Sequence, residues 1–167
     1  MLSDATCEWL GIDREELNKL ICGDVREIFE TMVNVGDIEP VEMVGPLDTH
    51  FKDCVTAMVG FAGFFNGVVS VHASEALAMK FTSQMLGIDV DEVGEDVVDA
   101  LGEIANMIGG SFKHHLSRGG EEVKLSTPSV ITGKEYFVNS VAQSEALPMR
   151  FKTGDTDFVV SVIIERD

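Results

Sequence analysis

The sequence predicts an α+β fold in which an antiparallel β-sheet packs with long α-helices. Two stretches, 13–33 and 94–116, repeat apolar residues at the spacing of an amphipathic helix. Short β-branched runs lie between and after them, separated by turn-forming residues as in neighbouring antiparallel strands. A chain of 167 residues can bury a core without disulfides. We therefore expect a single domain over residues 14–167, with residues 1–13 as an N-terminal extension.

Each expected helix is bounded by residues that start or stop helices. The first, a helix or a helix pair over 13–33, ends before Gly36. Ser74 is suited to cap a second helix, which ends at Gly87. The third begins near residue 94 and continues to about residue 116. The order is helix, hairpin, helix, helix and then strands, which favours an antiparallel sheet over a doubly wound parallel one.

The expected strands are short and are joined by tight turns. Gly63 and Asn66 supply turn residues for a hairpin, and Gly154 does the same before the last strand. Pro148 is interpreted as a break between two strands. We expect strands at 41–45, 53–61, 67–73, 123–126, 135–146, 149–152 and 157–164.

The charge of the chain restricts its partners. It carries 29 acidic and 12 basic side chains, a formal net charge of −17. Such a chain repels phosphate backbones and anionic headgroups, so we expect no binding to nucleic acid or to a membrane surface. The three cysteines are scattered, which fits a reducing compartment. Charges interrupt any apolar run at the start of the chain, and we expect a cytoplasmic protein.

Three polar residues form a row on the third helix. At about 100° per residue, Asp99, Glu103 and Asn106 fall within about 60° of one another. The row lies nearly opposite an apolar stripe made of Val97, Leu101, Ile104, Ile108 and Phe112. A side-chain amide can orient an attacking water in phosphoryl hydrolysis, as it does in GTPases. Glu103 could pair with a lysine of a partner, and Asp99 could strengthen docking.

Glycines accompany this row. Glycine inside a helix costs up to about 1 kcal/mol relative to alanine, yet the helix holds Gly102, Gly109 and Gly110. They indicate close approach either by a partner or by the protein's own sheet. For the first alternative, we expect Gly102 and Gly110 at a docking surface.

The segment from Asp99 to Gly110 resembles the signature of the CheC/CheX chemotaxis phosphatases: an Asp or Ser, three residues, Glu, two residues, Asn. The order of elements over residues 20–165 is also similar. The resemblance implies hydrolysis of the aspartyl phosphate of a CheY-like response-regulator receiver domain in chemotaxis. In that family the asparagine positions the attacking water and the glutamate contacts a receiver lysine. It therefore implies catalytic roles for Asn106 and Glu103.

The family fold contains an internal pseudo-repeat, and CheC-type members carry two active motifs. Here Glu27 and Glu30 align with Glu103 and Asn106, and Gly23 falls where an Asp or Ser belongs. A carboxylate at the asparagine position would repel the phosphoryl oxygens, so we expect the first helix to be inactive. One site per chain is closer to CheX than to CheC, which implies a homodimer.

We expect this chain to hold no metal or cofactor. The resemblance implies that Mg²⁺ arrives on the phosphorylated receiver. The sequence has no HExxH, CxxC pair or EF-hand loop, and the adjacent His114 and His115 point about 100° apart on a helix. His72, within a strand, is interpreted as a structural histidine.

A second hypothesis is a non-catalytic binding or adaptor module on the same scaffold. It predicts partner binding without any change in phosphate lifetime. Asn106 favours the enzyme, because a docking surface alone does not require an amide there.

Overall fold

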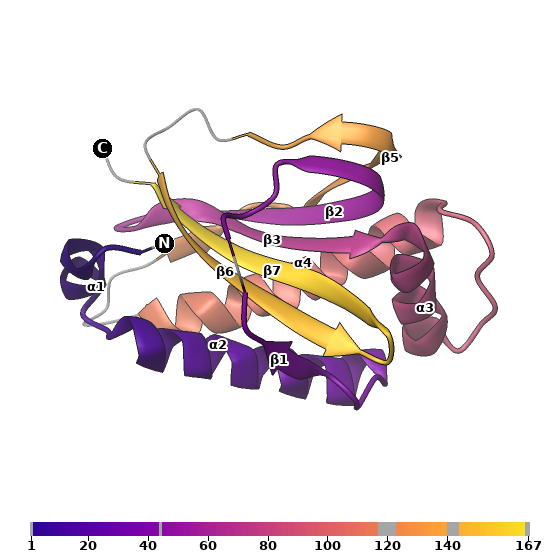
Figure 1. Ribbon diagram of the computed structural model, residues 1–167, viewed down its shortest axis with the longest axis horizontal. Coiled ribbons are helices and arrows are strands. Elements are labelled where there is room, and N and C mark those ends of the chain that lie inside the picture. Colours follow the sequence, from indigo (N-terminus) through magenta and orange to yellow (C-terminus); the bar gives the residue numbers. More distant parts are fainter. Residues whose placement is uncertain (1, 44, 117–122, 140–143, 166–167) are drawn as a thin grey trace.

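The computed structural model describes residues 2–43, 45–116, 123–139 and 144–165. A single antiparallel sheet forms one layer, and helices cover one of its faces (Figure 1). This is the α+β class that the sequence predicts.

Seven strands make up the sheet in the described part of the chain. Their order is β1-β6-β7-β3-β2, and both β4 and β5 then pair with β2. Every pairing is antiparallel. The strands are β1 (Glu39–Val41), β2 (His50–Gly63), β3 (Asn66–Ser74), β4 (Val123–Leu125), β5 (Ser129–Phe137), β6 (Ser144–Thr153) and β7 (Thr156–Glu165).

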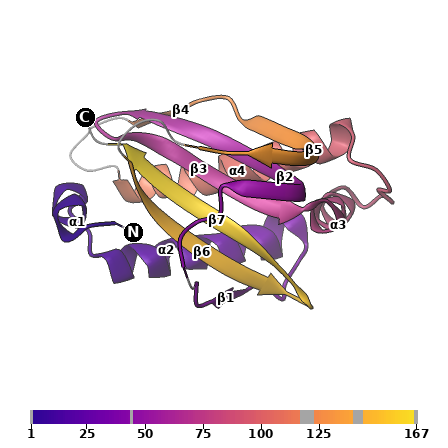
Figure 2. The same ribbon diagram turned by 45° about the horizontal axis from the view of Figure 1, so that its top comes forward.

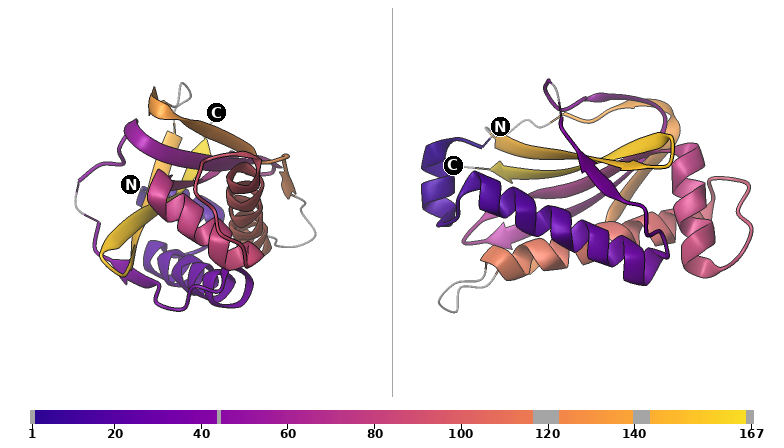
Figure 3. Two further views of the ribbon diagram at one scale, coloured as in Figure 1. Left: turned by 90° about the vertical axis from the view of Figure 1, so that its right-hand side faces the viewer. Right: turned by 60° about the horizontal axis from the view of Figure 1, so that its bottom comes forward.

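The two longest helices run along the same face of the sheet, and a shorter one lies at its end (Figure 3). The first long helix continues directly into a five-residue π-helix, in which the backbone turn is wider. The helices are α1 (Asp4–Leu10), α2 (Arg14–Ile28), the π-helix η1 (Phe29–Val33), α3 (Glu75–Leu86) and α4 (Glu95–Leu116).

Capping residues mark the helix boundaries, among them the expected Ser74 and Gly87. The side chain of Asp13 accepts a hydrogen bond from the backbone N–H of Glu15 at 2.8 Å at the start of α2. Ser74 caps α3 by accepting from the N–H of Leu77 at 3.2 Å. Gly87 ends α3 with φ of 69°, a left-handed conformation that glycine adopts without strain. The three predicted helical segments are found as α2 with η1, as α3 and as α4.

The core lies between the sheet and the helices. Because side chains alternate along a strand, every second residue of the central strands faces α2 and α4. Phe29 of η1 fills the end of this layer, with ring centroids 4.8 Å from Phe81 and 5.1 Å from Phe158. Buried residues of this layer include Leu17, Ile21, Val25, Val55, Ala57, Val69, Val71, Ile104, Ile108, Val160 and Val162.

Three strand predictions need correction. β1 covers 39–41, whereas the expected strand is 41–45. In place of one strand over 135–146, β5 covers 129–137, and β6 begins at Ser144 and runs through Pro148 without a break. Residues 44 and 140–143 of the expected strands lie outside the described residues. The reason for the last error is the position of Pro148. It pairs with Ser161 of β7 on one side, whereas β1 pairs only with residues 150–152 of β6. In the described part of the chain, Pro148 therefore lies at a sheet edge, where no second ladder needs its missing N–H.

Residues 2–10 are anchored to the domain. Leu2, Cys7 and Leu10 are buried in the main core cluster. The backbone N–H of Ser3 donates to Oε2 of Glu145 on β6 at 2.9 Å. The segment expected to be an extension thus contributes to the core where it is described.

Candidate active site

α4 separates its buried and its polar residues as the helical wheel predicts. Its apolar stripe is buried against the sheet, from Val97 to Phe112. On the opposite side, Asp99 and Glu103 are exposed and Asn106 is half-buried. Three residues of helix separate Glu103 from Asn106, a rise of about 4.5 Å. The carboxylate and the amide are therefore presented outward, side by side.

The polar atoms of this row are available to a partner. Among the described residues, neither the Asn106 carboxamide nor the Glu103 and Asp99 carboxylates make a hydrogen bond or ion pair. An amide without an internal partner keeps both its donor and its acceptor atoms for a ligand. No contact within the described part of the chain therefore indicates a structural role for these three side chains.

The glycines of α4 divide into two kinds. A Cβ on Gly109 would lie 2.7 Å from Cγ1 of Val59, so this glycine lets the helix approach β2. A Cβ on Gly102 would lie 3.5 Å from Pro128, and Gly102 is buried. Gly110 has open space where its Cβ would be. Packing against its own sheet thus accounts for Gly109.

The expectation that Gly102 and Gly110 lie at a docking surface has a different outcome for each glycine. Burial corrects the expectation for Gly102, since it lies beneath the chain's own Pro128. Gly110 is half-buried and remains accessible beside the row.

The segment between β4 and β5 forms a fixed wall beside α4. The N–H of Ser126 donates to the carbonyl of Gly60 at 2.8 Å, and the N–H of Gly60 donates to Oγ of Ser126 at 2.9 Å. This reciprocal pair holds the start of the segment that ends with Pro128, next to Gly102. A partner that approaches Glu103 therefore meets a surface with a defined shape.

Sequence reasoning missed one residue of the row. Lys113 is half-buried on α4, seven residues after Asn106 and therefore on the same side of the helix. Extending the helical wheel by two turns would have found it. Its cation lies at the C-terminal end of the row and Asp99 at the N-terminal end, so the row has opposite charges at its two ends.

The corresponding residues of α2 and η1 differ in chemistry. Glu27 and Glu30 are both exposed, but Glu30 belongs to η1 whereas Glu27 belongs to α2. Ile28 and Phe29, which lie between them, keep right-handed α dihedral angles, with φ of −59° and −66°. The difference from Glu103 and Asn106 is therefore the carboxylate of Glu30 in place of an amide. Gly23 is exposed in the middle of α2.

The described residues contain no cluster of three His, Cys, Asp or Glu side chains that could hold a metal ion. Of the two neighbouring histidines, His115 contacts Oδ2 of Asp24 at 2.5 Å and so links α4 to α2. His114 is exposed. The helices in the described part include none long and apolar enough to cross a membrane.

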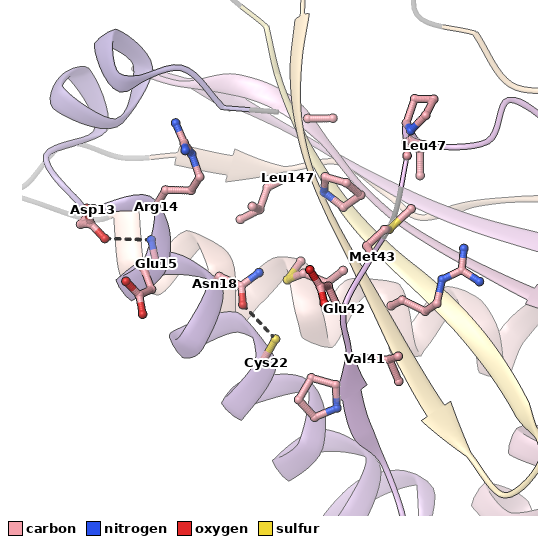
Figure 4. Close-up of a pocket in the computed structure, with 17 residues that line it drawn as sticks. Asp13, Arg14, Glu15, Asn18, Cys22, Val41, Glu42, Met43, Leu47 and Leu147 are labelled. Carbon is pink, nitrogen blue, oxygen red and sulfur yellow. Dashed lines mark hydrogen bonds between the residues drawn. The ribbon is translucent and has the colours of Figure 1, made fainter.

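A large cavity in the described part of the chain lies away from α4. It has a volume of about 1000 Å³ and lies between α2, β1 and β6 (Figure 4). Arg14, Asn18 and Cys22 face it from α2, with Val41 and Leu147 on the other side. None of its lining residues comes from α4. The polar row is therefore an outward-facing surface rather than the wall of this cavity.

A comparison with protein-family models shows which family the chain belongs to. The family model described as chemotaxis phosphatase CheX matches residues 55–152, which is more than half of the chain and includes all of α4. The chain belongs to the CheX family. The recognition made from residues 99–110 is thus confirmed.

Individual CheX relatives agree along most of the chain. The chain is 26% identical over 142 residues to the CheY-P phosphatase CheX of Thermotoga maritima, covering 83% of this chain and 92% of that one. The crystal structure of CheX from Desulfovibrio desulfuricans is 31% identical, with a TM-score of 0.77 over 90% of this chain and 99% of that one. A CheX–CheY–BeF3–Mg²⁺ complex from Borrelia burgdorferi, at 23% identity, shares the fold with a TM-score of 0.72, covering 93% and 99%.

Proposed function

We propose that this chain is a phosphatase for the aspartyl phosphate of a CheY-like response-regulator receiver in chemotaxis, with Asn106 and Glu103 as its catalytic residues. One observation carries the residue assignment: an amide and a carboxylate without internal partners stand side by side on the outer face of α4. The CheY-P phosphatase named among its relatives supports the reaction.

The chemistry needs little covalent help from this chain. Water attacks the phosphorus in line, the bond from phosphorus to the aspartyl oxygen breaks, and inorganic phosphate and a free carboxylate are the products. The carbonyl oxygen of Asn106 accepts a hydrogen bond from the water and so fixes its position and direction. Glu103 pairs with a lysine of the receiver and holds the amide in register with the phosphoryl group.

The divalent metal belongs to the partner in this proposal. A receiver phosphoaspartate is neutralised by Mg²⁺ and a lysine, which reduces its repulsion by a chain with a formal charge of −17. The Borrelia burgdorferi complex contains Mg²⁺ together with CheY, which is consistent with this division. This chain then supplies the amide and the docking surface, with Asp99 and Gly110 at its margin.

We place the protein in the cytoplasm, where receivers are phosphorylated, and we propose a homodimer. Within the described residues β5 pairs only with β2, so its outer edge is free (Figure 2). Phe137 at the end of β5 is 63% exposed. A free strand edge beside an exposed aromatic ring is a surface on which a second copy could pair. Light scattering that finds only an 18 kDa species would refute the dimer.

Phosphate release tests the proposal. A receiver phosphorylated in the presence of Mg²⁺ is mixed with the protein, and inorganic phosphate is followed in time. We expect Asn106→Ala to lose the acceleration on the order of 10²-fold while it still binds the receiver. Glu103→Ala should lose both turnover and binding, because a charge-assisted contact is removed.

Glu30→Ala on η1 is the matched control, since it removes an exposed carboxylate outside the row. It should match the unchanged protein. Equal turnover of the Asn106 and Glu103 variants and the unchanged protein would contradict the residue assignment. A protein that binds the receiver without shortening the phosphate lifetime would instead be the adaptor.

A further inference from the structure

One extra residue interrupts the strand pairing beside α4. β4 and β5 both pair with β2, along the same side of it (Figure 2). The β4 pairing ends at Leu125 opposite Phe61, and the β5 pairing begins at Ser129 opposite Met58. Three residues, 126–128, therefore face only two residues of β2, which makes them a β-bulge. β-Bulges are frequent next to active sites, where they redirect a side chain.

The 126–128 bulge is held in one shape by its own contacts. Ser126 and Gly60 exchange two hydrogen bonds, and Oγ of Ser126 also donates to the carbonyl of Thr127 at 3.1 Å. The ring of Pro128 fixes its own φ and keeps the preceding Thr127 out of the helical region. Every residue of the bulge is therefore restrained before a partner arrives.

The bulge lies beside the polar row of α4. Cβ of Pro128 is 3.5 Å from the position that a Cβ on Gly102 would take. Gly102 is three residues after Asp99 and four before Asn106, so these three residues are neighbours on one side of the helix. Because Gly102 has no side chain, Pro128 approaches the helix closely within one turn of Asn106.

The surface of the bulge differs in charge from the row. Ser126, Thr127 and the following Ser129 are exposed, and Pro128 is half-buried. None of these four residues is charged, whereas the row contains two carboxylates and the whole chain has a formal charge of −17. A receiver that docks on the row therefore meets an uncharged ridge along one side of it.

We propose that the 126–128 bulge is a second contact surface for the receiver and that Ser126 is its positioning residue. This inference rests on the proposed function, since the row supplies the first contact. The hydrogen bonds of Ser126 with Gly60 hold Pro128 against α4, and Thr127 and Pro128 contact an uncharged part of the receiver. Such a contact is equal before and during phosphoryl transfer, so it strengthens receiver binding without changing the chemical step.

Two measurements test the positioning role: steady-state phosphate release, and calorimetric titration with a receiver that carries beryllium fluoride in place of the phosphoryl group. We expect Ser126→Ala to raise both KM and Kd about fivefold, the effect of one lost hydrogen bond, with kcat unchanged. Ser126→Thr retains the hydroxyl and should return both constants to within twofold of the unchanged protein. A lower apparent kcat with unchanged KM and Kd would mean a purely structural role and would overturn the proposal.

Ser129→Ala is the matched control, because it removes an exposed serine hydroxyl just outside the bulge. It should change KM and Kd less than twofold. Since the bulge is uncharged, the effect of Ser126→Ala should be the same at low and high salt. An effect that disappears at high salt would contradict the uncharged contact.

The failure of this inference is distinguishable from the failure of the proposed function. If the unchanged protein shortens the phosphate lifetime but Ser126→Ala and Ser129→Ala bind the receiver equally well, only the role of the bulge is wrong. If the unchanged protein binds the receiver without hydrolysis, the phosphatase proposal is wrong and the Kd values alone decide the role of the bulge. Absence of receiver binding would overturn both.

Discussion

α2 and α4 occupy related places on one face of the same sheet, yet at the corresponding positions only α4 presents an amide one turn from a carboxylate. α4 is a regular helix through Glu103 and Asn106, and both side chains are accessible. The corresponding Glu27 and Glu30 are also accessible, but a π-helix begins between them at Phe29. Exposure is therefore not what distinguishes the two helices. The difference lies in the amide of Asn106, where α2 and η1 offer the carboxylate of Glu30.

The largest expected effect comes from copying the α2 residue onto α4. Asn106→Glu keeps an exposed polar side chain but replaces the amide by a carboxylate that repels the phosphoryl oxygens. We expect turnover of the phosphorylated receiver to fall on the order of 10²- to 10³-fold. Phosphate release measures it, and circular dichroism verifies the fold. Glu30→Asn, placed in this variant, should not restore activity, because Gly23 stands where α4 has Asp99. Recovery would contradict the assignment of the site to α4 alone.

Glycine packing gives the next contrast. Gly109→Ala places a Cβ 2.7 Å from Val59, and the resulting overpacking should lower the free energy of unfolding by about 1–3 kcal/mol. Gly23 of α2 has nothing within 4 Å of its Cβ position, so Gly23→Ala should raise it by up to about 1 kcal/mol. Urea denaturation measures both. Equal effects of the two substitutions would mean that α4 does not need its close approach to β2.

Lys113 provides a smaller effect on docking. Lys113→Glu removes the only cation of the polar row and should raise the KM for the phosphorylated receiver several-fold while kcat stays the same, because a peripheral charge contributes to association. Steady-state phosphate release at low and high salt measures the change, which should shrink at high salt. Arg26→Glu, an exposed cation on α2, is the matched control and should leave KM unchanged.

The contact between the two helices gives the smallest effect. Asp24→Asn weakens the 2.5 Å contact with His115, which is only partly exposed to solvent. We expect a loss of about 1 kcal/mol in the free energy of unfolding, as for one hydrogen bond. A double-mutant cycle with His115→Ala isolates the pair. Additive losses would show that α2 and α4 are joined by apolar packing alone.

The sequence was sufficient for the parts of the molecule that local patterns determine. The apolar stripe of α4 fixed which way Asn106 faces, since periodicity alone orients a long helix. The ends of β5 and β6 could not be predicted from local patterns, because Pro148 is tolerated only at a sheet edge that tertiary structure creates. Gly102 and Gly110 look alike in sequence, yet one lies under Pro128 and the other is open.

Asn106 and Glu103 project from the outer face of α4, and the described part of the chain does not enclose them in a pocket. In the proposed mechanism this chain supplies half of a reaction centre, and the receiver supplies the other half together with the bond to be cut. Acetyl phosphate and nitrophenyl phosphate bring no protein surface that could complete the site, so we expect that this chain does not hydrolyse them. For the same reason, an inhibitor of this protein would have to bind over the outer face of α4 instead of occupying a pocket.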